Sequence, residues 1–252
     1  MFGSFAYGHA PVWAQESLIA VQSSLRRIMR EGSTFRAMAT RVGESEWWLA
    51  HELREFQSRT LRAIVDCAAR HVPFYRDRYR SLCLDPQAWD FPQTIARLPL
   101  IDKDEVRAAG RSLMSERKRG PAFAGSTSGT TGAPLHLFQD LAAINRENAF
   151  VSRQLAWAGL RPGDRRAWIR GDMIVPAEER KPPYWRLNRA ENMLMLSSYH
   201  LSASAAPAYL EALARFDPTV IQAYPSSIGF LATWMRGDNC RYRGSALRAI
   251  VT

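Results

Sequence analysis

Short apolar runs alternate with helical segments over residues 167–251 of this 252-residue chain, and this alternation restricts the fold more than any other feature. The runs have the length and composition of buried strands and cover residues 167–169, 193–196, 220–223 and 247–251. The segments between the later runs carry apolar residues at steps of three and four, which is typical of amphipathic helices. Strand–helix–strand order implies parallel pairing, so we expect an α/β fold with a parallel-containing sheet.

The first part of the chain has a different pattern. Leu53, Phe56 and Leu61 recur at roughly helical spacing, and no strand-like alternation competes with them. Trp47 and Trp48 precede this face and are expected to pack in a core. Asp102 followed by Glu105 has the spacing of a capping box and predicts a helix to about residue 115. We therefore expect a helical N-terminal region over residues 1–101 and an α/β domain over residues 102–252.

The segment from residue 120 to residue 140 predicts a glycine-rich turn that leads into a strand, as in a hairpin. Its turn consists of glycine and hydroxyl residues: Ser126, Thr127, Ser128, Gly129, Thr130, Thr131 and Gly132. Such a turn can direct several backbone N–H groups and hydroxyls at one anion, so a phosphate-bearing ligand is expected. It is not a Walker A loop, because Ala133-Pro134 follows the last glycine. The alternative is a flexible linker without a ligand.

Charge and cysteine content exclude several classes of function. The net charge is +10, but the 34 basic residues include only three lysines, Lys103, Lys118 and Lys181, and the arginines are spread along the chain. No nucleic-acid recognition motif accompanies this charge, so no nucleic-acid partner is expected. Three cysteines without Cys/His ligand spacing predict no metal site. No apolar run reaches membrane-spanning length and no signal-peptide pattern is visible, so a cytoplasmic protein without a membrane span is expected.

The loop and several other segments resemble one protein family. The stretch Thr127-Ser128-Gly129-Thr130-Thr131-Gly132-Ala133-Pro134-Leu135 is similar to the phosphate-binding signature of adenylate-forming (AMP-binding) ligases. The resemblance is strongest to the phenylacetate–CoA ligase-like branch, which includes coenzyme F390 synthetases and CapK-type capsule proteins. Further similar segments occur in the same order, at residues 72–76, 98–103, 198–202 and 224–226.

The resemblance implies a fold, a reaction and a set of contacts. It implies that residues 102–252 form part of the N-terminal domain of these enzymes. It implies ATP with Mg²⁺ as cofactor, a carboxylic acid as substrate and coenzyme A as a possible acceptor: the acid first forms an acyl-adenylate, and a thiol then displaces AMP. Thr127, Ser128, Thr130 and Thr131 would contact the phosphates. His200 and Tyr224 would line the substrate pocket, or serve only as structural residues.

No catalytic residue is assigned, since the ribose-binding aspartate and the catalytic lysine of this family lie beyond position 252. Together with the end of the chain after the last apolar run, this predicts a truncated fragment with an incomplete sheet. Such a fragment would be inactive alone, and would self-associate or need its missing C-terminal part. The alternative is a non-catalytic binding or scaffolding protein related to CapK in polysaccharide biosynthesis. A nucleic-acid-binding protein that uses its arginines is a weaker third hypothesis.

Overall fold

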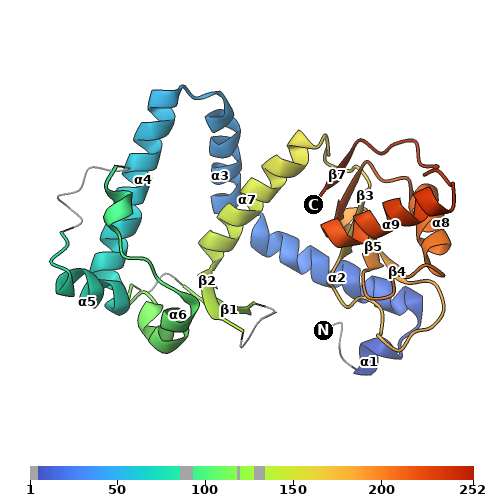
Figure 1. The fold of residues 1–252 in the computed structure, drawn as a ribbon, viewed down its shortest axis with the longest axis horizontal. Coiled ribbons are helices and arrows are strands. Elements are labelled where there is room, and N and C mark those ends of the chain that lie inside the picture. Colours follow the sequence, from blue (N-terminus) through green and yellow to red (C-terminus); the bar gives the residue numbers. More distant parts are fainter. Residues whose placement is uncertain (1–4, 86–92, 118–119, 128–133) are drawn as a thin grey trace. The chain divides into compact units, whose positions relative to one another are not determined.

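The structure is a computed structural model that describes residues 5–85, 93–117, 120–127 and 134–252 (Figure 1). It divides into two compact units, which we describe separately. Residues 1–31 and 150–252 form the sheet unit, and residues 32–149 form the hairpin unit. This division cuts across the expected boundary between residues 101 and 102. The division of the protein into functional domains at that point stays a prediction.

The sheet unit is built on a five-stranded mixed sheet with the order β4-β5-β3-β6-β7. Strands β3 Arg166–Arg170, β5 Met193–Ser197, β6 Val220–Ala223 and β7 Ala249–Val251 run parallel. The edge strand β4 Trp185–Asn188 runs antiparallel to β5. The expected α/β class and the four expected strands are confirmed. Strand β4 was not expected, because its sequence places an arginine and an asparagine among the apolar residues.

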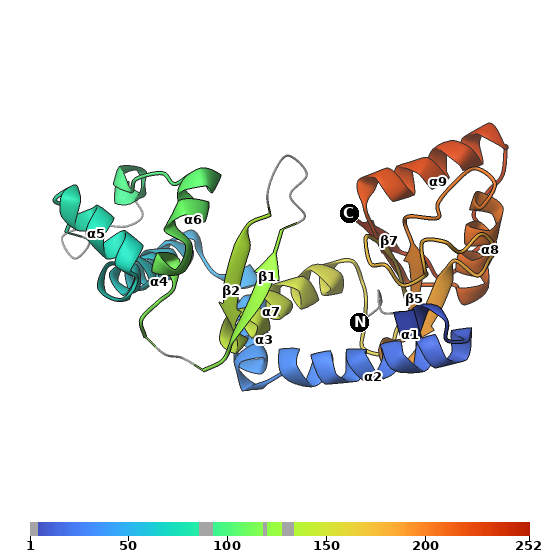
Figure 2. The ribbon, with the colours of Figure 1, turned by 90° about the horizontal axis from the view of Figure 1, so that it is seen from below.

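Helices cover both faces of this sheet (Figures 1 and 2). The side chains along each strand therefore point alternately to one covered face and to the other. Leu194 and Leu196 of β5 face α8 Ala206–Phe216 and α9 Pro225–Gly237, where Tyr209 and Leu213 are fully buried. Met193 and Met195 face the other side, where they pack with Ile19 of α2 Val12–Arg30 and with Tyr7 of α1 Phe5–Gly8. A strand covered on both faces reads as a continuous apolar run, which is why β5 was visible in the sequence.

Serine is a favourable N-cap residue, so the sequence predicts that a helix begins directly after Ser202. Helix α8 begins later, because it starts at Ala206 and its N-cap is Ala205. The carbonyl oxygen of Ser202 accepts hydrogen bonds from the backbone N–H groups of both alanines instead. A turn therefore separates Ser202 from the helix.

The hairpin unit consists of helices and one two-stranded sheet. Its helices are α3 Ser33–Glu44, α4 Ala50–His71, α5 Pro73–Ser81, α6 Lys103–Ala109 and the start of α7 Leu141–Trp157, and its strands are β1 Ala122–Ser126 and β2 His136–Asp140. Val65 and Tyr79 are buried where α4 meets α5. The expectation that Trp47 packs in a core is wrong, because its side chain is 85% exposed, whereas the ring of Trp48 contacts Phe56.

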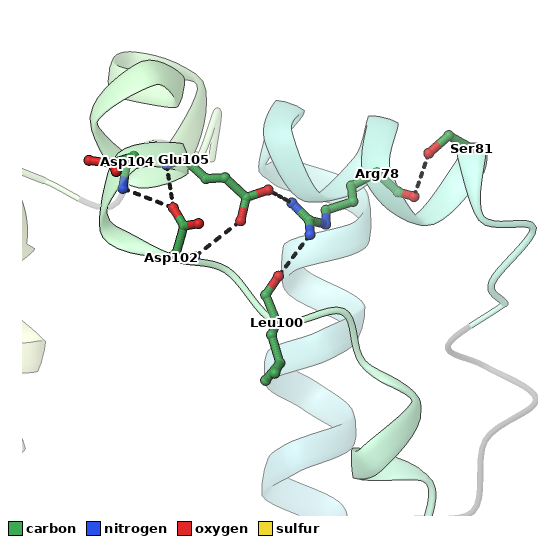
Figure 3. Close-up of polar contacts among 6 residues, drawn as sticks. All are labelled: Arg78, Ser81, Leu100, Asp102, Asp104 and Glu105. Carbon is green, nitrogen blue, oxygen red and sulfur yellow. Dashed lines mark hydrogen bonds and ion pairs between the residues drawn. The ribbon is translucent and has the colours of Figure 1, made fainter.

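The predicted capping box at Asp102 is present and is extended by an arginine (Figure 3). The Asp102 carboxylate accepts hydrogen bonds from the backbone N–H groups of Asp104 and Glu105, and the Glu105 carboxylate accepts one from the N–H of Asp102. Arg78 of α5 donates to Glu105 at 2.5 Å and to the carbonyl oxygen of Leu100 at 2.7 Å. This network fixes the start of α6 against α5. The helix is shorter than expected, because Gly110 adopts a positive φ of 49° and a 3-10 turn follows.

We expect Arg78→Ala to destabilise the hairpin unit in a pH-dependent way. The Arg78 guanidinium beside Glu105, with the Asp102 N–H, holds the pKa of that carboxyl below its usual range. The folded pKa is therefore below the unfolded value of about 4.3, so this contribution is present above that pH and is lost as the pH falls through the folded pKa. Thermal melts of wild type and variant should converge as the pH is lowered from neutral to about 3.

Arg80→Ala is the matched control on the same helix, because the Arg80 side chain is 76% exposed and lies 3.9 Å from its partner Asp77. It should not change the melting temperature at any pH. A difference between wild type and Arg78→Ala that stays constant over this pH range would contradict the assignment to Glu105.

Candidate functional site

The phosphate loop predicted from the sequence starts and ends on the hairpin of β1 and β2. Ser126 pairs with His136 as the last pair of the antiparallel ladder. Beyond it, the backbone N–H of Thr127 donates to the carbonyl oxygen of Leu135 at 3.0 Å, and the N–H of Leu135 donates to the Thr127 Oγ1 at 3.1 Å. The predicted hairpin is thus confirmed. Ser126 and Thr127 are both exposed at its end.

The remaining predicted loop residues are Ser128, Gly129, Thr130, Thr131 and Gly132, and they lie outside the described residues. The structure therefore fixes where the loop leaves and re-enters the hairpin. Thr127 combines two possible roles, because its hydroxyl oxygen already accepts a bond from Leu135 while its O–H remains able to donate. The phosphate-binding role of all seven residues stays a prediction.

A second group of candidate residues meets at the carboxyl edge of the sheet in the sheet unit. Strands β3, β5 and β6 are parallel and in register, so the residues that follow them gather at one edge. The Ser198 hydroxyl donates to the carbonyl oxygen of Arg170 at 3.0 Å, and the Tyr199 hydroxyl donates to that of Gly171 at 3.1 Å. The N–H of Tyr224 donates to the carbonyl oxygen of Ile169. Ligands of α/β proteins usually bind at such an edge.

His200 is fixed from two sides. Its Nδ1 lies 2.8 Å from the Ser197 hydroxyl, and its ring stacks on Tyr184 with centroids 5.0 Å apart. Behind it, the buried Tyr209 donates to the carbonyl oxygen of Ser197 at 2.6 Å, and burial raises the pKa of Tyr209. The Nε2 of His200 is buried and has no hydrogen-bond partner in the described part of the chain. The ring is therefore held from two sides, and its Nε2 is a buried polar atom without a partner among the described residues.

Tyr224 lies close to Gly171. A Cβ atom placed on Gly171 would be 3.2 Å from the Tyr224 hydroxyl oxygen and 3.6 Å from that of Tyr199, so glycine permits both rings to approach the backbone. The Arg170 guanidinium lies over the Tyr224 ring, 5.2 Å from its centroid. The structure thus brings Tyr199 and Tyr224 together around Gly171. Arg170 and Gly171 were missed in the sequence, and Tyr199 appeared there only as a member of the family-like segment 198–202.

Metal-ligand clusters and membrane-spanning helices are both absent from the described residues. No cluster of three or more histidine, cysteine or carboxylate side chains in the described ranges has the geometry of a metal site. Within the same ranges, every helix is too short or too polar to cross a membrane.

Comparison with known proteins finds two relatives that match part of their own length. The chain is 22% identical over 236 residues to the Protein CapK of Staphylococcus aureus, which covers 94% of this chain and 51% of CapK. It is 29% identical over 113 residues to the phenylacetate-coenzyme A ligase of Thermus thermophilus, covering 44% of this chain and 25% of that enzyme. The chain thus spans about half the length of CapK. No family model matches the sequence.

Solved structures give the same fold. A 2-hydroxyisobutyryl-CoA ligase in complex with 2-HIB-AMP and CoA, in an open conformation, aligns with a TM-score of 0.55 and 17% identity over 80% of this chain and 47% of that one. Its thioesterification state aligns with a TM-score of 0.56 and 21% identity over 80% and 43%. The chain shares the fold of these ligase structures over part of their length. The chain is a homologue of CapK and of phenylacetate-CoA ligase over part of their length.

Proposed function

We propose that this chain supplies the triphosphate-binding loop and part of the acid pocket of an ATP-dependent acid–thiol ligase. The observation that carries the proposal is the hairpin of β1 and β2, which holds a glycine- and hydroxyl-rich loop in a chain with the fold of CoA ligases. A phenylacetate-CoA ligase among its relatives supports an acid with an apolar body as substrate.

The loop suits the β- and γ-phosphates of ATP. Ser126 and Thr127 are exposed at its start, and the hydroxyls of Ser128, Thr130 and Thr131 add O–H donors to its backbone N–H groups. Fixed donors of this kind hold and orient a phosphate without reorganising. Mg²⁺ bound with the nucleotide would neutralise part of the phosphate charge. Coenzyme A is the proposed acceptor, since the aligned ligase binds CoA and an acyl-adenylate.

The proposed reaction has two steps. An oxygen of the substrate carboxylate attacks the α-phosphorus of ATP, the bond to the β-phosphate oxygen breaks, and pyrophosphate leaves. The thiol sulfur then attacks the acyl carbon, its proton is lost and AMP leaves. His200 and Tyr224 would contact the acid at the carboxyl edge of the sheet. Residues 102–252 would be the portion of the catalytic domain that this chain contains. The proposed location is the cytoplasm, because the reaction needs ATP and coenzyme A.

A non-catalytic binding protein is the second candidate. It is favoured by one observation: the match to CapK covers 94% of this chain, whereas the match to the ligase covers 44%. A protein of this kind would retain nucleotide binding without forming an adenylate.

Calorimetric titration of the purified 252-residue protein with Mg·ATP tests the nucleotide-binding proposal. We expect saturable binding with a dissociation constant of about 0.1–1 mM, because one loop alone contributes roughly 4–5 kcal/mol. Inorganic tripolyphosphate should compete, since the loop would hold the phosphates, whereas adenosine should not. Competition by adenosine but not by tripolyphosphate, or no binding at all, would contradict the assigned site.

A further inference from the structure

Arg170 ends strand β3 at the carboxyl edge of the sheet, and its guanidinium lies over two aromatic rings. Its guanidinium carbon lies 4.9 Å from the centroid of Trp168 and 5.2 Å from that of Tyr224. Trp168 is itself fixed, because its indole N–H donates to the Asp172 carboxylate at 2.5 Å. These cation–π contacts restrict the guanidinium and use none of its N–H donors.

Arg170 differs from the other arginine of the same strand. Arg166 forms an ion pair with Glu191 and donates to the side-chain oxygen of Gln222. In the part of the chain that the structure describes, Arg170 forms no ion pair, and its side chain donates no hydrogen bond. The nearby Asp172 carboxylate serves Trp168 instead. Arg170 is therefore a preorganised cation at this edge without an anionic partner in the described part.

The stacking restricts the kind of anion that can be bound. The guanidinium lies over the rings of Trp168 and Tyr224. An incoming anion therefore meets the edge of the guanidinium, where the N–H donors form a planar fork. A carboxylate matches this fork with two parallel hydrogen bonds. The surroundings are aromatic and partly wet, since the side chains of Tyr224 and Tyr199 are 42% and 61% exposed. An acid with a flat apolar body fits these surroundings.

We propose that Arg170 binds a second carboxylate of the acid substrate, so that the substrate is an aromatic dicarboxylic acid. This inference rests on the proposed ligase function and deepens it. The carboxylate at Arg170 is not the one that reacts, because a carboxylate held by two charge-assisted hydrogen bonds is a poor nucleophile. Arg170 is thus a specificity-determining residue that anchors the far end of the substrate.

Binding of two probe acids to the 252-residue protein tests this inference without ATP. The probes are phenylacetate and 4-carboxyphenylacetate, and their dissociation constants are measured by ligand-observed NMR. We expect the diacid to bind at least about tenfold more tightly, which corresponds to about 1.4 kcal/mol. Arg170→Gln should abolish the preference, and Arg170→Lys should retain only part of it, because lysine keeps the charge but loses the fork.

Arg165→Gln is the matched control, because Arg165 directly precedes the same strand and also lies over an aromatic ring, that of Phe216. It should leave the preference intact, and circular dichroism should show that all variants are folded. Equal affinity of wild type for the two acids, no binding of either, or a preference that survives Arg170→Gln would each overturn the inference. Weaker tripolyphosphate binding by Arg170→Gln, with diacid binding unchanged, would assign Arg170 to a phosphate and also overturn it. A protein that prefers the diacid but does not bind Mg·ATP would contradict the ligase function and leave the anchor in place.

Discussion

Replacing Ser128, Thr130 and Thr131 together by alanine is expected to weaken tripolyphosphate binding to the 252-residue protein by at least about a hundredfold. A hydrogen bond to a charged oxygen contributes about 1.5 kcal/mol, so three lost hydroxyls remove roughly 3–4.5 kcal/mol. The backbone N–H groups of the loop remain in the variant and can still bind the phosphates. The loss of binding free energy is therefore smaller than the full sum of three bonds, which gives the lower end of the range. Competition against a fluorescent ATP analogue measures the change as a lower limit, because a hundredfold loss raises the dissociation constant to about 10 mM or more.

Thr127 is left unchanged in this variant, because its Oγ1 also accepts the N–H of Leu135 and its removal would disturb the end of the hairpin. A matched control removes three hydroxyls elsewhere: Ser17→Ala, Thr40→Ala and Ser81→Ala. Each of these is exposed and donates only to a carbonyl oxygen of its own helix. Affinity in the control should equal that of wild type. Loss of less than about threefold in the loop variant would mean that these hydroxyls do not contact phosphate.

The largest effect on stability is expected for Arg186→Ala in the sheet unit. Arg186 is only 3% exposed and lies in the edge strand β4. Its Nε donates to the Gln15 side-chain oxygen at 2.5 Å, and its Nη1 donates to the carbonyl oxygens of Pro183 and Trp185 at 2.8 and 2.7 Å. Gln15 in turn donates to the carbonyl oxygens of Tyr7 and Ala10. Burial lowers the pKa of Arg186 from its ordinary value, which reflects how little water reaches it.

Removing this side chain takes the donor from one buried and two partly buried acceptors and opens a cavity between α2 and β4. We expect the free energy of unfolding to fall by about 3–4 kcal/mol, measured by urea denaturation followed by circular dichroism. Arg189→Ala, three residues along and exposed, is the control and should change stability by less than about 0.5 kcal/mol. A change below about 1 kcal/mol for Arg186→Ala would show that α2 is held to β4 by its apolar contacts alone.

The sequence predicted those helices and strands whose apolar residues are the ones that become buried in the fold. Strands β3, β5 and β6 are apolar because helices cover the sheet, and α9 shows its apolar side at regular steps. Strand β4 could not be predicted, because Arg186 is buried against Gln15, which lies 171 residues away in the sequence. Trp47 was predicted wrongly for the opposite reason: a large apolar residue next to a helix need not face a core.

Some residues of the candidate site could also be predicted from the sequence, and others could not. The hairpin and its loop were visible, since glycines and hydroxyls in a short stretch have a local meaning. The proximity of Arg170, Gly171 and Tyr199 was not, because it depends on the parallel register of β3, β5 and β6, which brings segments about thirty and fifty residues apart to one edge. The family resemblance predicts that His200 and Tyr224 line a substrate pocket, and their contact with a substrate stays a proposal.

Acid-dependent pyrophosphate release tests the central claim most directly. Two proteins are compared with the same panel of aryl and acyl acids, Mg·ATP and coenzyme A: residues 1–252 alone, and residues 1–252 supplied with the region that corresponds to the second half of CapK and of the ligase. We predict no release above background from the first, because the resemblance places the ribose-binding aspartate and catalytic lysine in that second region, and acid-dependent release from the second. Absence of release from both proteins, despite Mg·ATP binding, would contradict the ligase function and favour a nucleotide-binding relative of CapK. Robust turnover by residues 1–252 alone would show that the essential groups lie within this chain.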